Sequence, residues 1–342
     1  MRLLPPTGRF EGVDDLLADL VQARLRWVSP RLREWYDDDR IARQLADGLR
    51  VEADRVGDEI FGAEFRDAVG VDASPDPADW ANRRLDLGPV GWAVTGIRFR
   101  GLDVSRPFVD VVATSETPTP DGLAVVADAV TPAYTSFVPL ALRVDVPDPD
   151  GLRAALEADR RFGKGSVDQY VVAGAVADLR DARRAASYDA VSLHPGDPVE
   201  LAGRVAAIYA ELTRRDPELR RWATPEDADS LAGCAEEGLL FEVRVAGEPA
   251  GVVASVRDDR HGLSGFGVEE LCLDAGVVGR RLASGVVQRL VDELPAADGD
   301  VLWGTIHPDN APSLRNALSV GREVVGGYVW VTPAGMPGMP AG

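Results

Sequence analysis

Residues 301–331, VLWGTIHPDNAPSLRNALSVGREVVGGYVWV, constrain the fold of this chain more than any other segment. Two apolar runs typical of strands flank one short run with helical spacing, and each join takes only a few residues. The segment therefore predicts strand, helix and strand in immediate succession. Together with the alternation upstream, it indicates an α/β class with a mixed sheet.

The residues before this run continue the alternation. Their spacing predicts a strand at 188–193, helices at 197–213 and 225–237, a hairpin at 239–256 and a strand at 266–273. The helix that follows carries an apolar stripe at i, i+4 spacing, made of Leu282, Val286, Leu290 and Leu294.

The N-terminal half has a different order of elements. Helical spacing covers 12–65, and four strand-like segments follow between 91 and 146, one of them at 122–130. A helix at 148–163 and an apolar strand at 169–179 lead into a loop. These features predict a helical-plus-antiparallel-sheet domain over 1–186, a second domain over 187–335 and a flexible tail over 336–342.

The composition narrows the choice of partners. The 342 residues carry a formal net charge of −19, which repels phosphate backbones and anionic membranes and weakly favours small cationic molecules. No apolar run is long enough to span a bilayer, and the first twelve residues lack the apolar core of a secretory signal, so we expect a cytoplasmic protein. Lys164 is the only lysine beside abundant arginine, which is typical of GC-rich bacterial coding.

Residue types that bind metals are sparse. Three His and two Cys are scattered without metal-ligand spacing, so we expect no metal. Cys234 and Cys272 are interpreted as free thiols of the core. His194 and His261 fall in predicted loops and receive no role.

Two segments of the C-terminal half carry a family resemblance. In EELCLDAGVVGRRLASGVVQRL, residues 269–290, a strand ends in an acidic turn, and a loop of small and basic residues opens a helix. In HPDNAPSLRNALSVGRE, residues 307–323, an Asn stands at a strand-to-helix turn. These segments, and the order of elements over 188–332, resemble the GNAT superfamily of N-acyltransferases.

The resemblance implies a site for acetyl-CoA or another acyl-CoA as the donor. The strand ending at Ile306 would splay from the strand ending at Leu273 and leave a gap for pantetheine, with Asn310 at its mouth. A helix N-terminus with small residues suits the pyrophosphate, because its amide groups lack partners and carry a positive dipole end. The implied donor-binding residues are Leu271, Cys272, Leu273, Val278, Gly279, Arg280, Arg281, Leu282, Ala283, Asn310 and Ser313.

The phosphate loop departs from the family pattern. Val278 stands at the usual Arg or Gln and Arg281 at the usual middle glycine, whereas Gly279 and Ala283 fit. Either Arg280 and Arg281 contact phosphate directly, or Arg281 blocks the loop and the donor is not CoA.

The second segment departs as well. Ala317 takes the place of the tyrosine that can protonate the leaving thiolate in the family, and Gly321-Arg322 replaces the usual Gly-Phe. The usual general acid is therefore missing, or another group serves. A thiolate needs little help to leave near neutral pH, so turnover is still possible.

Candidates for proton transfer are few. Acyl transfer to an amine needs a base, and Glu269 and Glu270 lie on the strand that would face the thioester. They point to opposite faces unless a bulge intervenes, and apolar neighbours would raise the pKa of either carboxyl group. Glu270 is preferred because it shares a face with Cys272. His307, at the end of the neighbouring strand, is the third candidate, as a base or a donor to the acyl oxygen.

A short echo links the two halves. Residues 143–172 and 303–331 share three dipeptides at similar places. The echo suggests a tandem whose first copy is a degenerate GNAT-like domain, because 123–146 leaves no room for a phosphate loop and its helix. The matching pairs are Pro147-Asp148 with Pro308-Asp309, Leu152-Arg153 with Leu314-Arg315, and Tyr170-Val171 with Tyr328-Val329.

These features predict an N-acyltransferase that moves an acyl group, expected to be acetyl, from acyl-CoA to the amine of a small molecule. Two alternatives stay open. The same fold could use aminoacyl-tRNA or a carrier-protein thioester as its donor, although the acidity of the chain argues against tRNA. Alternatively, the protein could be a non-catalytic binding or regulatory module.

Overall fold

The computed structural model describes residues 13–70, 75–89 and 91–340, so the start of the chain that bears on a signal peptide lies outside it. Contacts divide the described residues into two compact units. The first unit takes the residues up to Tyr170, Arg260–Gly262 and the residues from Val325 on, and the second takes Val171–Asp259 and Leu263–Val324. The predicted boundary after residue 186 falls inside the second unit, and the division into separate folding domains stays a prediction.

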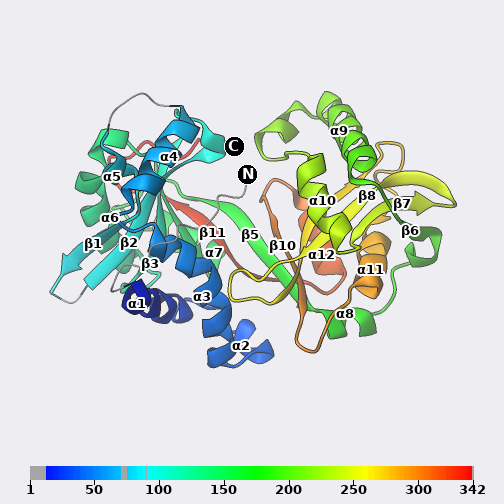
Figure 1. Ribbon diagram of the computed structural model, residues 1–342, viewed down its shortest axis with the longest axis horizontal. Helices are drawn as coiled ribbons and strands as arrows, with labels where there is room; N and C mark the ends of the chain where they lie inside the picture. The colour runs from blue at the N-terminus through cyan, green and yellow to red at the C-terminus, as the bar shows by residue number, and fades with distance from the viewer. Residues whose placement is uncertain (1–12, 71–74, 90, 341–342) are drawn as a thin grey trace. The chain divides into compact units, whose positions relative to one another are not determined.

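The first unit begins with helices, as the spacing over 12–65 predicts (Figure 1). The acidic run at 37–39 starts one of them, because the Asp37 carboxylate accepts a hydrogen bond of 2.7 Å from the Arg40 backbone amide. The helices are α1 (Val13–Leu25), α2 (Leu32–Trp35), α3 (Asp38–Asp54), α4 (Glu59–Val69) and α5 (Pro77–Trp80).

The strands of the first unit follow the order β1-β2-β3-β4-β11-β5. β1, β2 and β3 are antiparallel neighbours, whereas β4 runs parallel to β3. The last strand of the chain, β11, lies antiparallel to β4, with Val331 opposite Leu142. The bounds are β1 (Arg83–Gly88), β2 (Gly91–Phe99), β3 (Pro107–Thr114), β4 (Leu142–Val146), β5 (Ser166–Ala175) and β11 (Glu323–Val331), with α7 (Pro149–Glu157) between β4 and β5.

The predicted strand at 122–130 is wrong, because this segment lies in helix α6 (Pro120–Ala133). Thr119 caps the helix by accepting from the Gly122 amide, and Pro120 occupies its first turn. The buried residues recur at helical spacing: Leu123, Val126, Ala127 and Val130. A helix therefore does stand between β3 and β4, so the stated reason for calling the first copy degenerate is also wrong.

The second unit has the predicted order of elements. Its strands follow the order β5-β10-β9-β8-β7-β6, in which β6 to β9 are antiparallel and β10 runs parallel to β9. The predicted strand at 169–179 is shorter, because 176–181 form a helix. The elements are α8 (Val176–Asp181), β6 (Val191–Pro195), α9 (Pro198–Arg215), α10 (Ala228–Glu236), β7 (Leu240–Val245), β8 (Glu248–Arg257), β9 (Gly265–Leu273), α11 (Ala283–Glu293), β10 (Val301–Ile306) and α12 (Ala311–Ser319).

Side chains that alternate along the strands of the second unit contribute to two separate cores. Helix α11 packs with Val243, Val253 and Phe266 on one face. Helices α9 and α10 pack with Val252 and Cys272 on the other. Both cysteines are free and buried, as predicted. Within the described ranges, no helix is both long enough and apolar enough to cross a bilayer.

The expected tail is packed over its described part. Met336 and Met339 contact buried apolar residues of the first unit, and the Gly338 amide donates to the Leu140 carbonyl at 2.8 Å. Residues 341 and 342 lie outside the described residues.

Two stretches of the chain, 83–175 and 240–331, each pass through three antiparallel strands, a helix, a parallel strand, a second helix and a last strand. Asp148 caps α7 and Asn310 caps α12, so the echoed segments occupy equivalent places in this order. The tandem origin, and the loss of function in the first copy, stay predictions.

Candidate functional site

The predicted divergence of two strands is present in the second unit. β10 pairs with β9 over Val301–Trp303, opposite Gly265–Gly267. Beyond this point β10 continues to Ile306, while β9 continues to Leu273 paired with β8 alone. Beyond Trp303 and Gly267, the backbone groups on the facing edges of β9 and β10 no longer pair with each other, which is the separation that the resemblance implies.

A β-bulge lies next to the divergence. Ala254 of β8 stands opposite Glu270, but its neighbour Ser255 stands opposite Val268, so Glu269 is an extra residue in β9. A carboxylate oxygen of Glu269 lies 3.3 Å from the position that a Cβ on Gly267 would take. Burial, and then the charge of Glu269, raise the pKa of Cys234 in α10 to about 12. The bulge therefore turns Glu269 towards the α9–α10 face, where Glu270 also lies.

Glu270 is the buried carboxyl group of this face, with only 3% of its surface exposed. The Tyr209 hydroxyl of α9 donates to Glu270 Oε1 at 3.2 Å, and the Glu226 backbone amide also donates to the carboxylate. Burial nevertheless raises the pKa of Glu270 to about 7. Among the side chains that the structure describes, no Lys, Arg or His forms an ion pair with it. A carboxyl group that titrates near neutrality can take a proton from an ammonium group.

His307 directly follows β10, and Trp222 and Asp309 contact its ring. Its ring stacks on Trp222 with centroids 5.6 Å apart and planes 5° apart. The Asp309 backbone amide donates to His307 Nδ1 at 3.2 Å, which makes Nδ1 an acceptor and leaves Nε2 as the position for a proton. The ring is positioned, and its role as base or donor stays a prediction.

The predicted donor segment, 271–283, combines buried and exposed parts. Leu271 and Leu273 pack against the α11 core, Cys272 faces the α9–α10 core, and Leu282 is buried at the start of α11. No side chain in the described structure caps α11, which begins at Ala283, so the amides of its first turn remain available to an anion. The exposed residues are Gly276, Val278, Gly279, Arg280 and Arg281.

Arg281 adopts a conformation that suits the family's glycine better than an arginine. Its φ is 57° and that of Gly279 is 84°, both in the left-handed region. The Ser187 hydroxyl donates to the Arg281 carbonyl at 3.0 Å and fixes this turn. The backbone of the loop thus keeps the left-handed conformation that glycine favours. The Arg281 side chain is exposed.

The second predicted segment meets the first. Asn310 accepts from the Ser313 amide at 3.2 Å, so its side-chain oxygen caps α12. The Ser284 hydroxyl in the first turn of α11 donates to the Asn316 side chain of α12 at 2.9 Å. The structure therefore brings the two segments that carry the resemblance together.

Arg322 is a residue that the sequence interpretation did not use. It is 5% exposed, its Nε has no hydrogen-bond partner, and it forms no ion pair among the described side chains. Burial lowers the pKa of its guanidinium group to about 10. The sequence did contain an indication of this residue, since Gly321-Arg322 replaces the family's Gly-Phe. A charged residue at a position that is normally apolar is costly to bury and therefore points to a function.

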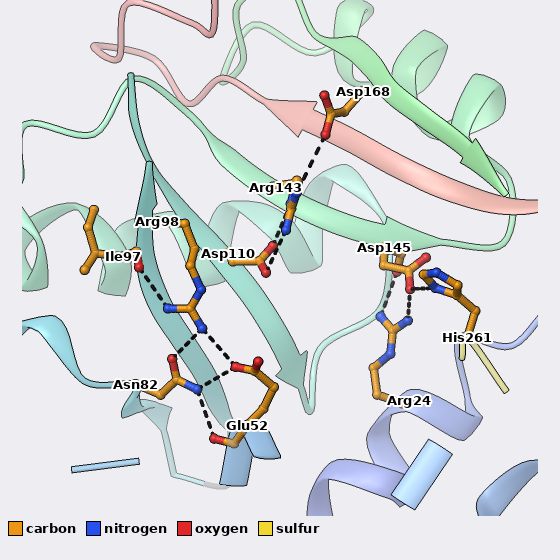
Figure 2. Close-up of polar contacts among 10 residues, drawn as sticks. All are labelled: Arg24, Glu52, Asn82, Ile97, Arg98, Asp110, Arg143, Asp145, Asp168 and His261. Carbon is orange, nitrogen blue, oxygen red and sulfur yellow. Dashed lines mark hydrogen bonds and ion pairs between the residues drawn. The ribbon is translucent and has the colours of Figure 1, made fainter. Parts of the chain in front are cut away.

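The first unit contains a polar pocket of about 540 Å³ that the sequence interpretation missed. Its lining comes from α1 and α3, from strands β2, β3, β4 and β11, and from residues 55, 260 and 261. Figure 2 shows three groups of polar contacts around it.

Each carboxylate drawn in Figure 2 contacts an arginine. Arg143 binds Asp110 through two hydrogen bonds of 2.9 and 3.0 Å, and its Nη1 lies 3.7 Å from Asp168. Arg98 donates to Glu52 and to the Asn82 side chain, both at 2.9 Å. Because these acids are neutralised, none of them resembles the unpaired base of the second unit.

The third group joins distant parts of the sequence. Arg24 of α1 binds the side chain of Asp145 and, at 2.9 Å, its backbone carbonyl. His261, whose φ is 57°, places Nδ1 3.4 Å from the same carboxylate. Burial favours the neutral acid, but the charge of Arg24 and the contact with His261 outweigh it and lower the pKa of Asp145 to about 2. Arg24 and His261 both lie far from β4 in the sequence. Sequence spacing therefore could not predict their contact with Asp145.

In the described part of the chain, no three His, Cys, Asp or Glu side chains gather in a way that could hold a metal ion.

Neither a known family model nor any curated protein matches this sequence. Among solved structures, the chain is similar to an acetyltransferase of the GNAT family from Colwellia psychrerythraea, with 11% identity, a TM-score of 0.46, and coverage of 71% of this chain and 81% of that one. It is also similar to a GCN5-related N-acetyltransferase from Sphaerobacter thermophilus, with 15% identity, a TM-score of 0.45, and coverage of 82% and 92%.

A third similar structure, a conserved protein of unknown function from Bacteroides thetaiotaomicron, has 12% identity, a TM-score of 0.41, and coverage of 72% and 85%. GNAT-family acetyltransferases are thus among the solved structures that this chain is similar to, at values so low that its function has to be argued from its own residues.

Proposed function

We propose that the second unit is an N-acyltransferase that moves an acyl group from acyl-CoA to the amine of a small molecule. The observation that carries this proposal is Glu270, a buried carboxyl group with a pKa of about 7 next to the divergence of β9 and β10. Structural carboxylates in proteins are usually paired or exposed, whereas a carboxyl group poised near neutral pH suits general base catalysis.

In the proposed reaction, Glu270 takes one proton from the ammonium group of the acceptor. The free amine attacks the thioester carbonyl carbon, the new C–N bond forms, the C–S bond breaks, and the nitrogen releases its second proton to solvent. Backbone amides freed by the bulge and by the end of the β9–β10 pairing donate to the carbonyl oxygen, where negative charge develops.

The thiolate leaves without help from the usual position, because that position holds the buried Ala317. It takes its proton from solvent after departure. The pyrophosphate of the donor would bind at the uncapped start of α11, with Arg280 and Arg281 beside it.

Two matched variants test the base. Glu270→Gln keeps the size and hydrogen bonding of the side chain and removes its basicity, so we expect kcat to fall by roughly 10². Glu269→Gln, at the exposed neighbour, is the control and should keep most of the rate. The assay is thiol release from acetyl-CoA with a panel of small amines, measured on the full chain between pH 5 and 9.

The pH profile distinguishes a base from a structural carboxyl group. The wild-type rate should rise to a plateau with an apparent pKa near 7, and this acidic limb should disappear in Glu270→Gln. If both variants keep wild-type rates at every pH, His307 or solvent takes the proton and the assignment of Glu270 is wrong.

The left-handed backbone conformation of Arg281 motivates a second candidate function, in which the acyl group comes from a donor other than CoA. Arg281 occupies the position at which the backbone geometry suits glycine, so it could exclude CoA while a carrier-protein thioester still enters. Thermal shift of the full chain separates the candidates. Stabilisation by acyl-CoAs supports the first, indifference to CoA with a response to a carrier-protein thioester supports the second, and a response to amines alone supports a non-catalytic module.

A further inference from the structure

Arg322 lies at the root of the divergence between β9 and β10. It directly follows the turn after α12, where its backbone amide donates to the Ala317 carbonyl at 3.1 Å. Its Nη1 lies 3.8 Å from the position that a Cβ on Gly304 would take, and Val268 borders the same position. Gly304 and Val268 are the first residues beyond the last paired residues, Trp303 and Gly267. The guanidinium group therefore lies where the two strands begin to separate.

Arg322 belongs to the face opposite Glu270. Leu302, two residues before Gly304, packs in the α11 core, and so do Val320 and Val268. Glu270 faces Tyr209 and the α9–α10 core instead. A thioester held between the strands would thus meet the base from one face and the guanidinium group from the other.

The guanidinium group has no compensating charge among the described residues. Its Nε is buried without a hydrogen-bond partner, the side chain is only 5% exposed, and burial alone lowers the pKa of the group, with no carboxylate to oppose it. Burying an unpaired charge opposes folding, so such a residue is retained where a partner arrives from outside. An anion is the partner that would compensate its charge as well as accept its hydrogen bonds.

We propose that Arg322 binds a carboxylate at the far end of the acyl chain, so that the preferred donor is the CoA thioester of a short dicarboxylic acid. This inference rests on the proposed function and specifies its acyl group. The other anionic groups of the donor are not candidates for binding Arg322. The pyrophosphate is expected at the start of α11 with Arg280 and Arg281. The thiolate exists only after the C–S bond has broken. A terminal carboxylate is present throughout and fits the planar guanidinium group in a bidentate manner.

Gly304 supports the same assignment. A glycine in the interior of a strand weakens the strand and often marks a close approach by another group. On this strand it leaves the side of the backbone next to the guanidinium group without a side chain. An acyl chain that extends from the thioester to the root of the divergence would lie against this glycine and end at Arg322.

Isothermal titration of the full chain with matched CoA thioesters tests the proposal. Succinyl-CoA and butyryl-CoA have acyl groups of equal carbon number and differ in the terminal group, and malonyl-CoA and propionyl-CoA form a shorter pair. The wild type should bind the carboxylate member of at least one pair ten- to a hundredfold more tightly than the neutral member. In Arg322→Met this preference should disappear, while butyryl-CoA binds no more weakly than to the wild type.

Two further variants serve as controls. Arg322→Lys keeps the charge and should retain part of the preference, which also covers the case in which the Met variant fails to fold. Arg280→Met removes an exposed arginine of the phosphate loop and should weaken all four thioesters by the same factor.

The outcomes separate this inference from the proposed function. Equal binding of charged and neutral thioesters by the wild type overturns the carboxylate assignment and leaves the acyltransferase proposal standing. The same holds if Arg322→Met weakens every thioester equally, because Arg322 would then contact a part common to all of them. If no CoA thioester binds at all, the proposed donor, and with it both proposals, fails.

Discussion

In the first unit Arg143 lies between Asp110 and Asp168, whereas in the second unit Arg322 forms no ion pair among the described residues, and burial alone shifts its pKa. The carboxylates differ in the same way. Asp145 contacts Arg24 and His261, whereas Glu270 accepts from the Tyr209 hydroxyl and the Glu226 amide and lies near the like charge of the Glu226 carboxylate. The chain stretches 83–175 and 240–331 run through a similar order of elements, so this order does not require the difference in how the buried charges are paired.

The contrast distinguishes two uses of a buried charge. A paired charge fixes the positions of the elements that carry it, and removing one member leaves the other uncompensated. An unpaired buried charge does not fix the position of another element and opposes folding. It therefore indicates a position where a bound substrate or a proton neutralises the charge. On this basis the second unit, and not the first, is where we expect chemistry.

The same substitution in the two units should have opposite effects on stability. Arg143→Met leaves Asp110 without this partner, while Asp168 keeps Arg100 at 3.4 Å, and we expect the free energy of unfolding to fall by about 3 kcal/mol. Arg322→Met removes an uncompensated charge and should leave the stability unchanged or raise it. Denaturant unfolding of both variants checks this, and a large loss of stability in Arg322→Met would show that its charge is structural after all.

A change of pH should also affect the stability contributed by Glu270 and by Asp145 in opposite directions. The folded-state pKa of Glu270, about 7, is raised above its ordinary value of 4.5, so the native state keeps a proton between these values and loses stability as the pH rises through them. The effect approaches about 3 kcal/mol at 1.4 kcal/mol per unit. The folded-state pKa of Asp145, about 2, is lowered from 3.8, so its contribution is present above pH 4 and is lost as the pH falls towards 2.

Two amide variants isolate these contributions. Relative to the wild type, Glu270→Gln should gain stability above pH 7, and Asp145→Asn should lose stability above pH 4 but not near pH 2. Melting temperatures across this pH range provide the measurement. Parallel curves for wild type and variant would contradict the assigned pKa shift at that residue.

The smallest expected effect concerns the exposed loop before α11. Arg281→Gly removes a side chain from a left-handed residue with φ of 57° and should raise the stability by about 1 kcal/mol. If the guanidinium group contacts phosphate, CoA binds roughly tenfold more weakly. A rise in affinity would instead show that Arg281 obstructs the loop, and Arg280→Ala is the control for a general loss of charge.

Much of the second unit follows from sequence periodicity. The strand-helix-strand run at 301–331 and the apolar stripe on α11 have the spacing that local geometry requires, and both are present in the structure. The strand predicted at 122–130 fails for a reason that also lies in the sequence. Thr119 and Pro120 form a helix start, and that signal outweighs an apolar run that periodicity alone cannot assign.

The sequence by itself determined which segments would form strands and helices around the candidate site, and it placed two carboxyl groups on one of those strands. Only the tertiary structure decided which of them is buried, because a bulge in β9 and the approach of Tyr209 depend on pairing with β8 and packing of α9. It also decided that Arg143 is paired and Arg322 is not. Charge pairing is a property of side chains brought together by folding, and residues such as Asp110 and Asp168 are neighbours in space while lying far apart in the chain.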